Sequence, residues 1–199
     1  MSRTISRRSS LAFLLTLLAA TPATALTIAP SAQADEPGRV CMFQAPTGAE
    51  IGGHYAGHVG WAYRWDNGSG RWDFGATENE REAWNLNGTW DEVRDTFRHR
   101  RNPNNAPGPY YTRYRCINTR GHDQHAAFVK RERLDHTKYV LQGAPWNDGT
   151  NNCLTRAVEI FKAYDNSGGL NHLNSGKNLI WPNKYFADAL DGFERARFL

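Results

Sequence analysis

A chain of 199 residues with a formal net charge of +4 is long enough to bury a sizeable core, and its positive charge raises the question of a nucleic-acid partner. Three of its 24 basic residues and none of its 20 acidic residues fall within residues 1–34. Residues 35–199 therefore hold 21 basic and 20 acidic groups, a net charge of +1, which argues against nucleic acid as a partner. They are numerous enough for a single domain.

Residues 1–34 have the three parts of an export signal. Arginines come first, residues 11–20 form a short apolar core, and Ala32-Gln33-Ala34 is a cleavage site of small residues. The apolar run is about half the roughly 20 residues that a membrane-spanning helix needs. We therefore expect a cleaved signal peptide and a secreted, extracellular domain over residues 35–199 with no membrane anchor. The Arg7-Arg8 pair leaves the export route open between the general and the twin-arginine pathways.

The first predicted strand covers residues 58–65, after a loose lead-in over residues 35–50. Large apolar side chains recur there with a period of two, at Val59, Trp61, Tyr63 and Trp65. His58 begins this strand and points to the opposite face. Asn67-Gly68 predicts a type I′ hairpin into a return strand, and with that register Asp73 shares the face of His58.

The rest of the chain mixes loops, strands and helices. We expect, in order, a loop with a short helix over 78–97, a surface loop over 102–109, a strand over 110–117, a helix over 122–134 and a short strand or extended segment over 139–141. The clearest helix begins at Cys153, because apolar residues follow at i, i+3, i+4 and i+7 behind the capping residues Asn151-Asn152. It stops at residues 166–169, and a last short helix lies near 184–190.

The three cysteines cannot all pair within one chain. Export implies an oxidising destination, where cysteines tend to form disulfides. Cys41 opens the domain and Cys116 lies in a predicted strand, so we predict a Cys41–Cys116 bridge. Cys153 is left as a free thiol.

Cys153 and His58 form the candidate catalytic pair. A cysteine in the first turn of a helix lies near exposed N–H groups and the positive end of the helix dipole, which favour the nucleophilic thiolate. The same N–H groups can stabilise an oxyanion. A strand histidine facing that helix end can act as the general base. Asp73 is the expected third residue, and Thr77 and Glu78 compete with it for the role of orienting the imidazole.

A resemblance to a known family supports this interpretation. The chain resembles the circularly permuted papain-like hydrolases, in the branch of the NlpC superfamily that includes lecithin–retinol acyltransferase. The residues that carry the resemblance are Gly57-His58-Val59-Gly60, Trp72-Asp73-Phe74-Gly75, the Asn151-Asn152-Cys153 segment that follows Tyr139, and Trp181-Pro182-Asn183 as a proline-bearing return. The resemblance implies a Cys153 nucleophile and a His58 base. Asp73 departs from the family, because some members have a histidine there.

Other residue clusters give weaker signals. His122 and His125 are three residues apart, but no further ligand completes a metal site. The basic run Arg98-His99-Arg100-Arg101 is typical of a solvated loop. The aromatic residues alternate along the strands, as core residues do, although a secreted sugar-binding protein would use them on its surface. We expect no metal and no other cofactor.

Together these features predict an α+β domain whose antiparallel sheet packs against the helix that begins at Cys153. The predicted function is a secreted cysteine hydrolase, a peptidase or amidase of papain-like type, or an acyltransferase using the same residues. Its expected partner is a peptide, protein or peptidoglycan substrate. The alternative is a non-catalytic secreted module that binds carbohydrate or protein through an aromatic face.

Overall fold

The computed structural model describes residues 37–79, 82–102, 108–140, 152–174 and 181–199. Contacts between residues divide the chain into two units, Met1–Gln33 and Ala34–Leu199, and every described residue belongs to the second unit. The predicted signal peptide, residues 1–34, lies outside the described residues. None of the helices in the described ranges is long and apolar enough to cross a membrane.

The described chain is a mixed α+β structure, which confirms the predicted class. Its elements are β1 (Gly38–Ala45), β2 (Glu50–Ile51), β3 (His54–Tyr55), β4 (His58–Arg64), β5 (Trp72–Asn79), β6 (Glu82–Gly88), α1 (Trp90–His99), β7 (Arg113–Thr119), α2 (Gln124–Val140), α3 (Cys153–Tyr164), α4 (Pro182–Asp188) and β8 (Arg197–Phe198). Six strands form an antiparallel sheet in the order β6-β5-β4-β1-β7-β8, and β2 pairs with β3 alone.

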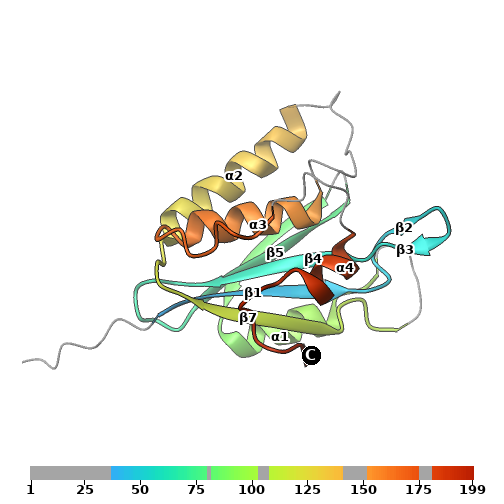
Figure 1. Cartoon of the computed structure of the whole chain (residues 1–199), viewed down its shortest axis with the longest axis horizontal. Coiled ribbons are helices and arrows are strands. Elements are labelled where there is room, and N and C mark those ends of the chain that lie inside the picture. The colour runs from blue at the N-terminus through green and yellow to red at the C-terminus, as the bar shows by residue number, and fades with distance from the viewer. Residues whose placement is uncertain (1–36, 80–81, 103–107, 141–151, 175–180) are drawn as a thin grey trace, which may run out of the picture. The chain divides into compact units, whose positions relative to one another are not determined.

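Helices cover both faces of the sheet (Figure 1). On one face, α3 packs against β4 and β5, and α2 packs on α3. The buried side chains of this layer include Val59, Trp61 and Tyr63 of β4 together with the apolar stripe of α3. On the other face, Phe97 of α1 packs with Phe43 and Phe74. Alternate residues of the central strands β1 and β4 thus enter two separate cores.

β1 is a central strand, so the expectation of a loose lead-in over residues 35–50 is wrong for Gly38–Ala45. The strand lies between β4 and β7. Val40 and Met42 enter the core beneath α3, whereas Cys41 and Phe43 enter the core beneath α1. A strand buried on both faces has no polar alternation, so its sequence lacks the usual period of two.

The hairpin between β4 and β5 is longer than the predicted two-residue turn. Arg64 pairs with Trp72, and the Trp65 N–H donates to the Arg71 carbonyl, 2.8 Å away, so residues 66–70 form the loop. Gly68 and Gly70 both have positive φ, 70° and 69°. This loop pairs Tyr63 with Asp73, one residue away from the predicted register. A one-residue shift moves every side chain of the return strand to the opposite face.

Several element boundaries also differ from those expected. Residues 82–88 form a strand, and α1 follows it with a capping box between Thr89 and Glu92. Residues 139–140 continue α2 instead of starting a strand. The surface loop expected at 102–109 lies mostly outside the described residues.

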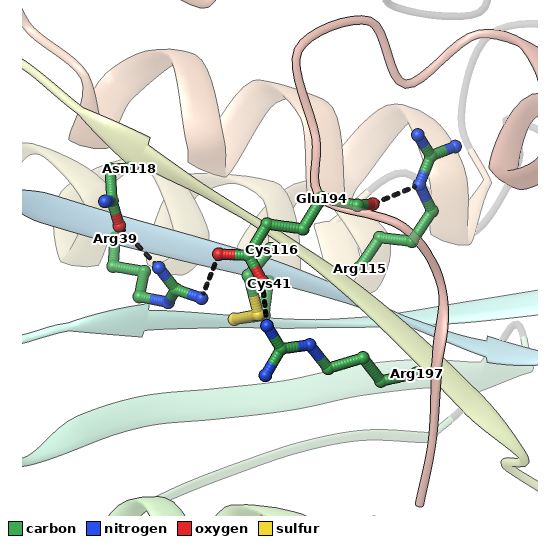
Figure 2. A network of polar contacts seen from close by, with 7 residues as sticks. All are labelled: Arg39, Cys41, Arg115, Cys116, Asn118, Glu194 and Arg197. Carbon is green, nitrogen blue, oxygen red and sulfur yellow. Dashed lines mark hydrogen bonds and ion pairs between the residues drawn. A yellow bond between two sulfur atoms is a disulfide. The ribbon is translucent and has the colours of Figure 1, made fainter.

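The disulfide between Cys41 and Cys116 confirms the predicted pairing and joins directly opposite residues of β1 and β7. Beside it, the carboxylate of Glu194 pairs with Arg39 (2.6 Å) and with Arg197 (3.0 Å), as Figure 2 shows. The backbone N–H of Glu194 donates to the Cys116 carbonyl, 2.7 Å away. These contacts fix the C-terminal segment across β7.

Candidate active site

Helix α3 begins at Cys153, as predicted. Asn152 is the capping residue: its side chain accepts from the Thr155 N–H (3.0 Å), and the Thr155 hydroxyl accepts from the Asn152 N–H (2.9 Å). This reciprocal pair satisfies two N–H groups that a helix start would otherwise leave free. The other N–H groups of the first turn still point toward the Cys153 end of the helix.

His58 lies at the start of β4, where its ring is enclosed by aromatic side chains. It stacks on Tyr110 with ring centroids 5.9 Å apart, and Tyr111 lies 6.0 Å away at a tilted angle. On the backbone side, the turn at Gly48 comes so close that a Cβ there would collide with His58 Cβ. The position of the imidazole is therefore set by two rings and one close backbone approach.

Cys153 and His58 are brought together by α3 and β4. The thiol lies beside the His58 side chain, and hydrogen bonding to that side chain and to the backbone N–H groups of Val59 and Leu154 favours the thiolate form. Burial raises the pKa of the Cys153 thiol, but the charge of His58 and these hydrogen bonds outweigh it, and the pKa is lowered from its ordinary value. The arrangement supplies what a nucleophilic cysteine needs, namely a nearby base and donors that stabilise the thiolate.

The site is closed in this structure. Cys153 is 4% exposed and His58 is 3% exposed, and Cys153 is the free cysteine. Residues 141–151, which lead into α3, lie outside the described residues.

Asp73 does not share the face of His58, and that part of the prediction is wrong. The observed register places it opposite Tyr63, five residues along β4 from His58, which is roughly 16 Å at about 3.3 Å per residue. One carboxylate oxygen accepts from the Tyr63 hydroxyl (2.9 Å) and the other from Trp65 Nε1 (3.0 Å). Burial and this carboxylate together raise the pKa of Tyr63. Asp73 is thus placed to hold the far end of the hairpin.

The two competing third residues have different outcomes. Thr77 is buried on the α3 side of β5, and its hydroxyl accepts from the buried Arg156 guanidinium, 3.3 Å away. Arg156 lies one turn after Cys153, so this bond ties β5 to the start of α3. The side chain of Glu78 lies outside the described residues.

The aromatic neighbours of His58 were missed by sequence reasoning. Tyr110 and Tyr111 were expected to start a strand, but they precede β7 and turn into the core beneath α1. A pair of tyrosines after a proline-rich loop carries no pattern that points to a distant histidine. Their role is visible only once the fold brings residues 58 and 110 together.

The weaker candidates remain apart from this pair. His122 precedes α2 and His125 lies in its first turn, and no group of three or more possible metal ligands occurs among the described residues. In the basic run, His99 pairs with Asp95 (3.1 Å) and Arg100 lies over the Trp84 ring, 4.7 Å from its centroid.

Comparisons of the chain with protein-family models, with curated proteins and with solved structures find no match.

Proposed function

We propose that this protein is a secreted cysteine hydrolase in which Cys153 attacks an amide carbonyl and His58 is its general base. The observation that carries the proposal is the placement of the Cys153 thiol, at the first residue of α3, beside His58, whose charge lowers the pKa of the thiol. The lowered pKa of that thiol is the property that distinguishes a reactive cysteine from a structural one.

The reaction follows from the two side chains. His58 takes the proton of the Cys153 thiol, and the thiolate sulfur bonds to the carbonyl carbon of the substrate. The N–H groups at the start of α3 stabilise the resulting oxyanion. When the carbon–nitrogen bond breaks, His58 returns its proton to the leaving amine and a thioester remains on Cys153. Water, deprotonated by His58, then releases the acid and restores the thiol.

The proposed fold type is the circularly permuted papain-like one. In its support, the strand that carries His58 precedes the helix that carries Cys153, and the sheet to which that strand belongs is antiparallel. The Cys41–Cys116 bridge supports an oxidising destination, which agrees with export. Peptide or cell-wall peptide amides are the proposed substrates, and transfer to an acceptor other than water would use the same residues.

A substrate panel tests the proposal. Peptides, a protein and peptidoglycan fragments are incubated with wild type, Cys153→Ala and His58→Gln, and the release of new amines is measured. We expect release by wild type alone, with a thioester on Cys153 trapped by rapid acid quenching and seen as added mass. Amine release that persists in Cys153→Ala would overturn the proposal.

A second function, binding without catalysis, is favoured by one observation. The β2–β3 hairpin and the start of α4 carry exposed aromatic side chains, with Tyr55 54% and Trp181 39% exposed, and the rings of His54 and Trp181 are 6.4 Å apart. Exposed aromatic rings of this kind suit a carbohydrate or protein surface. Binding of wild type and Cys153→Ala with equal affinity to a glycan, without any amine release, would favour this alternative.

A further inference from the structure

We infer that Asn183, in the first turn of α4, is the residue that positions His58 for the Cys153 thiol. The inference rests on the proposed function, since it assigns a role within that site. In the sequence, Trp181-Pro182-Asn183 indicates only a proline-bearing return of the chain. The structure gives Asn183 a much more specific set of contacts.

Every hydrogen-bonding group of the Asn183 side chain is used. Its amide nitrogen donates to the carbonyls of Pro46 (2.9 Å) and Tyr55 (3.1 Å), and its oxygen accepts from Gln44 Nε2, 3.0 Å away. Its backbone N–H donates to the Ala56 carbonyl, 3.0 Å away. A single side chain thus joins the end of β1, the turn that follows it and the end of the β2–β3 hairpin.

These partners surround His58 in the chain and in space. Tyr55 and Ala56 lead directly to Gly57 and His58. Pro46 belongs to the turn that brings Gly48 against the His58 side chain. This turn follows β1, in which Ala45 pairs with His58. Asn183 therefore holds the backbone on both sides of the histidine at once.

Gly57 shows how closely Asn183 approaches. This glycine has φ of +84°, and a Cβ there would collide with the Asn183 side-chain amide. The contact leaves no room between α4 and the residue that precedes His58. Any displacement of Asn183 is therefore transmitted to the start of β4.

Asn183 acts on the backbone around His58 and is a positioning residue. A histidine that moves away from a thiol by about 1 Å loses much of its hydrogen bond, because such bonds weaken steeply beyond their usual length. Burial of Cys153 would then dominate, and the pKa of the thiol would rise. Gln44→Leu, which removes one of the four bonds, should have a smaller effect in the same direction.

The test measures the fraction of Cys153 thiolate against pH in the full chain, from the ultraviolet absorbance of the thiolate with the Cys153→Ala signal subtracted. Asn183→Ala should raise the midpoint by roughly one pH unit, a tenfold loss of thiolate in the pH range below both midpoints. Asn118→Ala is the matched control, because Asn118 also accepts a side-chain bond, from Arg39, but lies near the disulfide. It should leave the midpoint unchanged.

Three outcomes are distinct. A raised midpoint in Asn183→Ala at temperatures where circular dichroism shows it folded supports the inference. An unchanged midpoint in folded Asn183→Ala, with a low midpoint in wild type, overturns the inference and leaves the proposed function intact. A wild-type midpoint at or above that of an ordinary thiol overturns the proposed function and, with it, the role of Asn183. If Asn183→Ala fails to fold, Gln44→Leu decides in the same way.

Discussion

The thiol of Cys153 lies beside the imidazole of His58, 95 residues earlier in the chain, because α3 packs on β4 with its first residue next to the start of that strand. His58 is needed to keep the thiol pKa low, since burial acts in the opposite direction. The relationship has direct consequences for the reactivity of Cys153.

Replacing His58 by a neutral residue should raise the pKa of Cys153. In His58→Gln the charge is gone while the burial remains, and burial disfavours the thiolate. We expect the alkylation rate with iodoacetamide near neutral pH to fall at least about tenfold, since only the thiolate reacts. His125→Gln, at an exposed position in α2, is the control and should react as wild type does.

Removing the Asp73 carboxylate should lower stability without changing the reactivity of Cys153. In Asp73→Ala the buried Tyr63 hydroxyl and Trp65 Nε1 lose their acceptor, which costs about 2 kcal/mol. Urea denaturation measures this loss, and Tyr63→Phe/Asp73→Ala should recover part of it. A slower alkylation of Cys153 in folded Asp73→Ala would contradict this prediction and would return Asp73 to the catalytic site.

Reduction of the Cys41–Cys116 bridge should destabilise the domain. The bridge closes a loop whose ends are 75 residues apart in sequence, and the chain-entropy model gives such a loop about 4 kcal/mol of stabilisation. The midpoint of urea denaturation should fall on adding a reductant and should fall equally in Cys41→Ala/Cys116→Ala, where the reductant has no further effect. A midpoint insensitive to reductant would contradict this.

A matched pair of glycine variants separates backbone strain from the contact with Asn183. Gly57 and Gly53 have similar φ, +84° and +80°, so alanine at either position costs about 1–2 kcal/mol in backbone strain. Only Gly57 faces the Asn183 amide, whereas a Cβ at Gly53 meets open space. Gly57→Ala should therefore lose more stability, measured by thermal unfolding, and slow the alkylation of Cys153, and Gly53→Ala should leave alkylation unchanged.

The helix that begins at Cys153 and the strand that begins at His58 could be predicted from sequence because local signals define both. An apolar stripe with a capping asparagine marks α3, and strict alternation marks β4. The disulfide followed from the count and placement of three cysteines. To predict that Cys153 meets His58, it was then enough to assume that the start of this helix lies beside the start of this strand.

Asp73 was misplaced because a hairpin register depends on loop length. Asn67-Gly68 is a strong signal for a two-residue turn, but the chain uses a loop over residues 66–70. This loop shifts the pairing of β4 with β5 by one residue, which moves Asp73 to the other face of the sheet. β1 was missed because both its faces are buried. Asn183 was missed because its four partners lie more than 100 residues earlier in the chain, beyond any local pattern.

The most direct test of the central claim is the rate at which iodoacetamide modifies Cys153 in the folded wild-type protein, followed against pH by peptide mapping. The Cys153–His58 pair predicts a rate that rises with pH to a plateau, with its midpoint below the roughly 8.5 of an ordinary thiol. A midpoint at or above 8.5, or a Cys153 that stays unmodified until the protein unfolds, would contradict the account.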